Sequence, residues 1–176
     1  MLAKLFGRRD DGSGAAAEAL YHGIVSAARR PVFFVEFEIP DTFDGRYEMV
    51  ALHAYLLLRR LKRDHGATAG VAQALFDLMF ADFDQVLRET GVGDLGVGRK
   101  VKQMATGFYG RIAAYDSGMD GEALEAALRR NAYGTVTAAD RSVARLAAYL
   151  HQADRDLAGQ ATSSLLAGRV SFPDPA

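Results

Sequence analysis

The sequence predicts an all-α protein, folded as a single compact domain of about six helices with an extended connection between helices one and two. Apolar residues recur three and four positions apart in several long segments. Glycine, proline and other turn residues separate these segments. Only residues 31–40 have a strand-like composition. They have no convincing partner strand, and a lone strand leaves its backbone polar groups without hydrogen bonds.

The composition fits one globular domain. The chain has 176 residues, of which 49% are hydrophobic and 24% are charged. Its net charge of -1 comes from 21 basic and 22 acidic side chains, so no global field attracts DNA or an anionic membrane. There is no cysteine, which excludes disulfides, thiol nucleophiles and zinc-thiolate sites. With no long apolar stretch, the protein is expected to be soluble and cytoplasmic.

The N-terminal part begins with a tail, followed by the first helix. Residues 1–14 mix apolar and basic residues before breaking into Asp, Gly and Ser, which predicts a flexible tail. Peripheral contact of this tail with the inner face of the cytoplasmic membrane is left open. Residues 15–30 form the first predicted helix, because apolar residues recur at helical spacing up to Pro31.

The second helix is the clearest one. Residues 40–44 supply turn and N-cap chemistry, and Val50, Ala54 and Leu57 then mark one face of a helix over residues 45–64. Basic residues at its end offset the negative end of the helix dipole, and Gly66 is a stop signal.

Four more helices are predicted downstream, over residues 68–90, 98–116 and 120–131, and from Thr137 or Asp140 to about residue 158. Thr68 is the expected cap of the first of these, and the glycines of residues 91–98 form the turn that follows it. The domain is expected to cover residues 15–170, followed by a flexible C-terminal tail at residues 171–176.

The chain offers no catalytic constellation. No two histidines stand at the spacing that places two metal ligands on one helix face. No acid and base pair can be chosen from the spacing of the carboxylates, and no serine lies in a nucleophile elbow. The prediction is a protein without catalytic residues, metal or cofactor. His53 is expected to be a core or boundary residue, although haem ligation by His53 or His65 is an alternative.

Basic and aromatic residues form two groups, each on one of the predicted helices. One group lies at the end of the second helix, around Arg59 and Arg63, and the other lies on the fourth helix, from Arg99 to Arg111. Such a set suits an acidic, amphipathic or RNA-containing partner. The alternative is that these cations pair with the acidic face of the third helix within the fold.

Several ordered segments resemble the ubiquinol-cytochrome c chaperone family. The first are Pro31-Val32-Phe33-Phe34 and the run from Pro40 to Met49. Further segments follow in the same order: Leu75-Phe76-Asp77, Asp82-Phe83-Asp84, Gly91-Val92-Gly93-Asp94, Lys100-Val101-Lys102 and Phe108-Tyr109-Gly110-Arg111. The resemblance covers roughly Leu20 to Tyr149.

The resemblance implies an all-helical, non-enzymatic assembly factor for ubiquinol:cytochrome c reductase, the respiratory complex III. Its expected partner is cytochrome b or another early assembly intermediate. Mitochondrial members have a long N-terminal extension and work near the ribosome, so a chain that starts here suggests a bacterial version and leaves ribosome contact open. The candidate client-binding residues are aromatic or basic: Phe33, Phe34, Phe37, Arg46, Arg59, Arg60, Arg63, Arg99, Lys100, Lys102, Tyr109 and Arg111.

Two other functions stay open at this point. The first is a haem-handling protein that uses His53 or Tyr109. The second is an RNA-binding or ribosome-binding helical module that uses the basic set, with binding that weakens steeply as salt is added. Exposure of Phe33, Phe34 and Phe37 would favour the chaperone.

Overall fold

The computed structural model describes residues 12–89, 93–119 and 123–175. Within these residues the chain is helical and contains no strand, which confirms the predicted all-α class. The described residues form eight helices: α1 (Ser13–Ala28), α2 (Val32–Val35), α3 (Phe43–Arg63), α4 (His65–Glu89), α5 (Asp94–Met119), α6 (Leu124–Arg130), α7 (Asp140–Gly159) and α8 (Thr162–Leu166).

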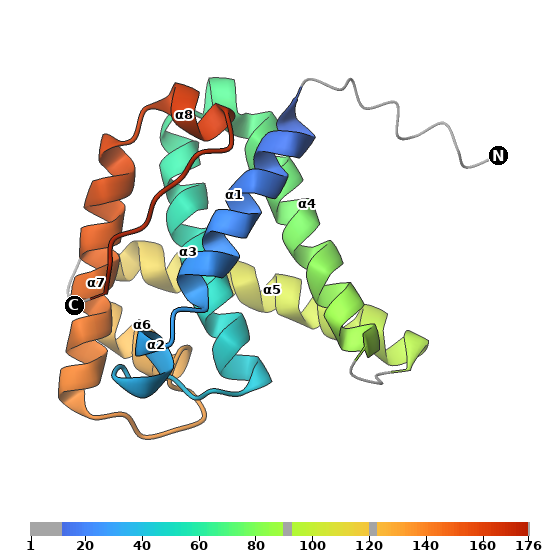
Figure 1. The fold of residues 1–176 in the computed structure, drawn as a ribbon. Helices are drawn as coiled ribbons and strands as arrows, with labels where there is room; N and C mark the ends of the chain where they lie inside the picture. Colours follow the sequence, from blue (N-terminus) through green and yellow to red (C-terminus); the bar gives the residue numbers. More distant parts are fainter. Residues whose placement is uncertain (1–11, 90–92, 120–122, 176) are drawn as a thin grey trace.

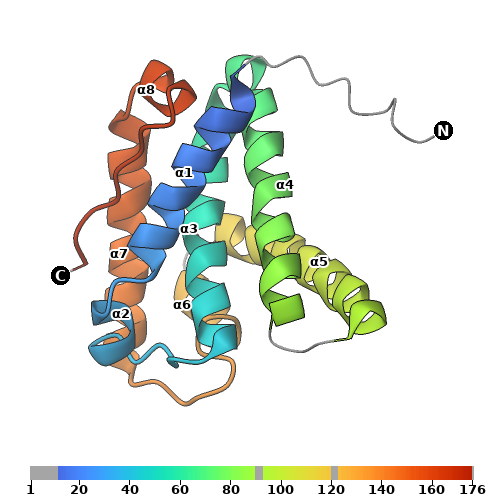
Figure 2. The same ribbon diagram turned by 45° about the vertical axis from the view of Figure 1, so that its right-hand side comes forward.

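Helix α3 is the centre of the fold. Helices α1, α4 and α7 pack against it, and α5 crosses it on the side away from α1 (Figures 1 and 2). The middle of α3, from Met49 to Leu57, is apolar apart from His53 and is buried on every side. A helix that is hydrophobic all round belongs in the interior. Its ends reach the surface, which is where charged residues gather.

The sequence predicts an extended connection between α1 and α3. In the structure this connection contains a short helix, α2. Pro31 starts one helical turn, in which the amides of Val35 and Glu36 donate to the carbonyls of Pro31 and Val32. This turn places Phe33 and Phe37 four residues apart on one side, and both side chains are fully buried. The gain from burying two phenylalanines explains why the helical turn forms here.

The junction between α3 and α4 also differs from the prediction. Helix α4 begins at His65, three residues before the expected cap. Thr68 is buried, and its hydroxyl donates to the carbonyls of Leu61 and Asp64, at 2.6 and 3.0 Å. Thr68 therefore adds a side-chain donor to two carbonyls at the end of α3 that also accept from backbone amides.

The two chain ends differ in how far the structure describes them. Residues 1–11, most of the predicted N-terminal tail, lie outside the described residues, and Ser13 and Gly14 belong to α1. At the other end, residues 169–175 run back beside α1 and α7 (Figures 1 and 2). Phe172 is buried against the ring of His53, and the Arg30 guanidinium donates to the carbonyl of Pro173. The domain limits at residues 15 and 170 stay a prediction.

Candidate interaction surface around the start of helix α3

The basic group at the end of α3 is engaged inside the molecule. Arg59 forms ion pairs with Asp116 of α5 and Asp154 of α7, at 2.7 and 3.3 Å. Arg63 forms a more exposed pair with the same Asp154, at 3.2 Å. These cations hold α3, α5 and α7 together, so the alternative of internal pairing applies to them, although their partners are not on α4.

Arg60 is buried, and its guanidinium closes the C-terminal end of α7. It donates to the carbonyls of Leu157 and Gln160, at 3.0 and 2.8 Å, and pairs with Asp64 at 2.8 Å. The last carbonyls of a helix lack their usual intrahelical donors, so a buried arginine that reaches them replaces water. The Leu157 carbonyl also accepts from the Gln160 amide, at 3.1 Å. This side chain stabilises the fold and is not available to a partner in this structure.

The three predicted phenylalanines separate into two kinds. Phe33 and Phe37 are fully buried, so neither side chain presents a contact surface in this structure, and the exposure that would favour the chaperone is not found at these two residues. Phe34 is half-buried, and its neighbour Val35 is 78% exposed. The apolar surface of α2 is therefore formed by Phe34 and Val35.

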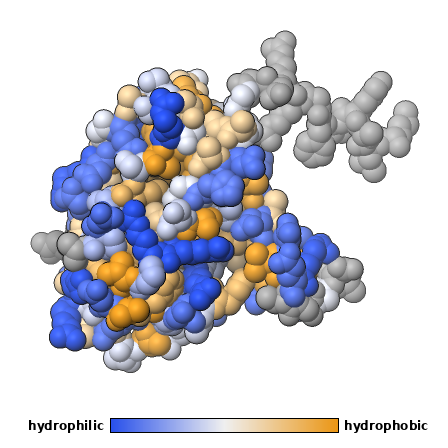
Figure 3. All heavy atoms as spheres, viewed as in Figure 1, coloured by the Kyte–Doolittle hydropathy of each residue, from blue (hydrophilic) through white to orange (hydrophobic). Residues whose placement is uncertain are grey.

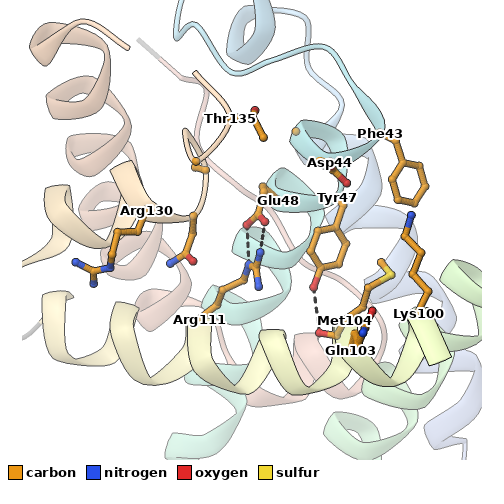
Figure 4. Close-up of a pocket in the computed structure, with 14 residues that line it drawn as sticks. Phe43, Asp44, Tyr47, Glu48, Lys100, Gln103, Met104, Arg111, Arg130 and Thr135 are labelled. Atoms are coloured by element: carbon orange, nitrogen blue, oxygen red, sulfur yellow. Dashed lines mark hydrogen bonds and ion pairs between the residues drawn. The ribbon is translucent and has the colours of Figure 1, made fainter. Parts of the chain in front are cut away.

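The predicted residues of α5 point to two different sides of that helix. Lys100 and Arg111 face the start of α3, where both line the same hollow (Figure 4). Tyr109 is 60% exposed on another side, where its ring lies 5.6 Å from that of Phe76 on α4. Arg99 and Lys102 are exposed as well, and at about 100° per residue Lys102 lies far around the helix from Lys100.

Three adjoining hollows surround the N-terminal end of α3, and we call their combined lining the α3-start surface. The first, about 410 Å³, lies between α3, α5 and the turn from α6 to α7. The second, about 190 Å³, lies between α1, α3 and α4, and Phe43 and Tyr47 form the wall that the two share. The third, about 340 Å³, lies next to α2 and shares Arg29 and Arg46 with the second. Figure 3 shows the surface hollowed between the lower parts of α3 and α4.

The first hollow has an apolar floor with a closed ion pair beside it. Tyr47 donates a hydrogen bond of 3.2 Å to the carbonyl of Met104, and burial raises the pKa of Tyr47 to about 12 (Figure 4). Arg111 donates two hydrogen bonds to the nearly buried Glu48, and this bidentate contact raises the pKa of the Arg111 guanidinium. The Lys100 ammonium lies 5.5 Å from the centre of the Phe43 ring.

The second and third hollows contain two further closed polar contacts. The Tyr21 hydroxyl donates to Asp82 at 2.7 Å, and burial together with this contact raises the pKa of Tyr21. Arg46 donates to Asp41 at 2.6 Å, and this hydrogen bond lowers the pKa of Asp41. Both members of the second pair are exposed, so the pair contributes little to stability.

The α3-start surface has more free cations than free carboxylates. Among the described residues, no carboxylate lies within ion-pair distance of Arg29, Lys100 or Arg130, and all three are exposed. Among the described residues that line the hollows, Asp44 is a carboxylate without a cation at ion-pair distance. It lies in the first turn of α3, where the helix dipole favours a negative charge. The surface therefore combines apolar hollows with a local excess of positive charge.

His53 does not have the geometry of a haem ligand. It is fully buried, with Nδ1 2.8 Å from the carbonyl of Met49 and Nε2 2.8 Å from the hydroxyl of Tyr149. Burial lowers its pKa to about 4. Both ring nitrogens are used within the core, so the hypothesis of haem ligation by His53 is wrong for this conformation. Across the described parts of the chain, no three His, Cys, Asp or Glu side chains gather as a metal site.

Sequence reasoning missed most of the lining. The sequence pattern indicates only turn or helix positions for Phe43, Tyr47 and Met104, and nothing in it distinguishes Arg29 or Arg130 from other surface cations. One signal was available for α5, because Lys100, Met104 and Arg111 stand at spacings that place them on one helix face. No comparable signal links Arg130 to them, since the α6 to α7 turn approaches α5 only in the folded chain.

None of the helices in the described ranges is apolar over a length that would cross a bilayer.

Comparisons with known proteins agree with one another. A family model described as ubiquinol-cytochrome C chaperone matches residues 35–172. The chain is 27% identical over 160 residues to ubiquinol-cytochrome c reductase complex assembly factor 1 of Homo sapiens. This match covers 89% of this chain and 54% of that protein. The Mus musculus protein of the same name is 27% identical over 139 residues, with 78% and 47% covered. The chain thus spans about half the length of the curated relatives that it matches.

A solved structure extends the likeness to nearly the whole chain. It is described as the crystal structure of the Cbp3 homolog from Brucella abortus. The two chains are 39% identical and superpose with a TM-score of 0.83. The superposition covers 99% of this chain and 97% of the other.

Proposed function

The chain belongs to the ubiquinol-cytochrome c chaperone family, and from this premise we propose that it is a non-enzymatic assembly chaperone for ubiquinol:cytochrome c reductase. Its client is cytochrome b or an early intermediate that contains it. The names of the human and mouse relatives support the reductase as the target, although the chain matches only about half of each relative.

The observation that carries the proposal is the α3-start surface. A chaperone for a membrane-protein subunit needs apolar contact together with charge matching, and it needs no bond-making residues. This surface offers the partly exposed Phe43 and Phe34 and the strongly exposed Val35. Next to them lie three cations that have no carboxylate partner among the described residues. Of the residues predicted from the sequence, it retains Phe34, Arg46, Lys100 and Arg111 as client-binding candidates.

A second candidate function rests on the outer side of α5. Tyr109, with its largely exposed ring, lies on the same helix as the exposed Arg99 and Lys102. An aromatic ring beside cations suits a nucleobase and a phosphate backbone, so ribosomal RNA is the partner that this side would take. Binding through these residues would weaken steeply with added salt, whereas apolar client contact would not.

The experiment is co-purification from the native host after gentle solubilisation of its membranes, with mass spectrometry of the bound proteins. The test variant carries Arg29→Glu and Lys100→Glu, which reverse two cations of the α3-start surface without breaking an ion pair between described residues. The matched control carries Lys62→Glu and Lys102→Glu, two exposed cations outside the hollows. Circular dichroism verifies that both variants fold.

The proposal expects cytochrome b with the wild type and the control and a strong loss with the test variant. Loss with the control alone would move the client contact to the outer side of α5 or the end of α3. Absence of every reductase subunit from all three samples, despite normal expression, would contradict the proposed function.

A further inference from the structure

The first hollow is shaped for a piece of polypeptide rather than for a small anion. Its volume of about 410 Å³ lies within the range of pockets that hold organic ligands, and its floor is formed by Tyr47 and Met104 with Phe43 as a wall. An inorganic anion would need several cations converging on one point. Here Lys100 and Arg130 lie apart on the rim, on α5 and at the end of α6 (Figure 4).

The cations of this hollow differ in what they can offer to a ligand. Arg111 is held by two hydrogen bonds to Glu48, so binding a second carboxylate would require breaking a nearly buried ion pair. Lys100 is exposed, stands over the Phe43 ring and has no carboxylate at ion-pair distance within the described residues. Lys100 is therefore the cation of the hollow that can pair with an incoming carboxylate at the lowest cost.

The hollow also has a direction along α5. Lys100, Met104 and Arg111 follow one side of the helix, over about 16 Å at the usual rise per residue. That length accommodates about three helical turns of a bound segment, or five extended residues. Asp44 lies at the rim beside Phe43, where its charge limits the number of carboxylates that this end of the hollow accepts (Figure 4).

We propose that this hollow binds an acidic, amphipathic segment of the client protein. A client carboxylate pairs with Lys100, and a neighbouring apolar side chain of the client lies against Tyr47, Phe43 and Met104. The inference rests on the proposed function for the existence of a client, and it adds the chemistry by which one segment of that client is recognised.

The test uses the full chain in its native host, with the photo-crosslinking residue p-benzoylphenylalanine in place of Gln103, an exposed side chain that lines the hollow. The same residue in place of Gln73, an exposed glutamine of α4 outside the hollow, is the matched control. We expect light-dependent crosslinks from position 103 alone, to client peptides that carry Asp or Glu next to apolar residues.

A charge reversal then identifies the cation. With the crosslinker at position 103, Lys100→Glu is expected to lower the crosslink yield about tenfold, while Lys102→Glu on the opposite side of α5 leaves it unchanged. An unchanged yield with Lys100→Glu would overturn the proposal, as would crosslinked peptides that lack acidic residues. Crosslinks to RNA, or to residues 1–11 of the chain itself, would overturn it in favour of those occupants.

The outcomes also separate this inference from the proposed function. If cytochrome b co-purifies but position 103 crosslinks to no acidic segment, the inference fails and the proposed function stands. If neither result is obtained, the proposed function fails and the inference fails with it.

Discussion

The hydroxyl of Tyr149 on α7 donates a hydrogen bond of 2.8 Å to Nε2 of His53 on α3, in the interior of the domain. Nδ1 of the same ring donates to the Met49 carbonyl, so the two contacts together fix the neutral tautomer. The rings of Phe33 and Phe172 meet the imidazole edge-on, with centroids 5.6 and 5.0 Å away. A protonated ring would lose the bond from Tyr149 and would place a charge in an apolar site.

Acid should destabilise the protein through His53. Its pKa is about 4 in the folded protein and 6.5 when exposed, so the unfolded chain binds more protons between these values. The contribution of neutral His53 to the free energy of unfolding is therefore fully present above pH 6.5. It is lost as the pH falls toward 4, which lowers the free energy of unfolding by about 3 kcal/mol in total. Urea unfolding followed by circular dichroism at pH 4.5, 5.5 and 7 measures this slope.

The double variant His53→Leu/Tyr149→Phe should flatten that slope, because it removes the titrating ring and the hydroxyl that would be left without a partner. His151→Gln, at a half-buried position of α7, serves as the control and should keep the wild-type slope. Equal slopes for wild type and the double variant would show that other groups cause the acid sensitivity.

Arg60 and Arg63 should differ strongly in their effect on stability, although they are one helical turn apart. Arg60→Ala removes one donor from each of the Leu157 and Gln160 carbonyls together with the ion pair to Asp64, and should cost about 3 kcal/mol. Arg63→Ala removes an exposed pair with Asp154 and should cost less than about 1 kcal/mol. Chemical denaturation at pH 7 compares the two, and similar losses would contradict the role given to Arg60.

Glu48 and Arg111 should behave as a coupled pair beside the first hollow. Arg111→Met leaves the nearly buried Glu48 carboxylate without its partner and should destabilise the fold by about 3 kcal/mol. Adding Glu48→Met removes that unpaired charge, so the double variant should be more stable than Arg111→Met alone. A double-mutant cycle with chemical denaturation measures the coupling, and strictly additive effects would argue against the pair.

Two glycines in helices should respond oppositely to alanine. At Gly45 a Cβ atom would lie 1.9 Å from the Pro40 carbonyl oxygen, so Gly45→Ala must shift the backbone before α3 and should cost at least about 2 kcal/mol. At Gly66 in α4 the space is open, so Gly66→Ala should raise stability by up to about 1 kcal/mol. Melting temperatures give both signs, and tolerance of alanine at position 45 would contradict the contact with Pro40.

Much of the fold follows from patterns that are local in the sequence. The long helices α1, α3, α4, α5 and α7 correspond to predicted segments, because their apolar spacing and their flanking Gly, Pro and Thr residues act over a few positions. The short helix α2 was missed since it consists of a single turn. Its formation depends on the burial of Phe33 and Phe37 against a core supplied by distant parts of the chain.

The candidate site was less predictable, because it depends on contacts between residues far apart in sequence. Arg59 and Arg63 look like free surface cations until Asp116 and Asp154 are brought beside them by folding. Lys100 and Lys102 look equivalent in the sequence, yet only Lys100 faces the hollow, because each residue turns the direction of the side chain by about 100°. Charge and composition can therefore indicate a partner class without identifying the surface.

The position of Phe172 has a consequence for how the protein is made. A ribosome synthesises the chain from its N-terminus, so α3 leaves the exit tunnel more than a hundred residues before Phe172 does. Until then, the side of His53 that Phe172 covers stays open, and Arg30 lacks the carbonyl of Pro173. The interior can be sealed only after residue 173 has left the exit tunnel, so this domain completes its folding once that segment is available rather than helix by helix during synthesis.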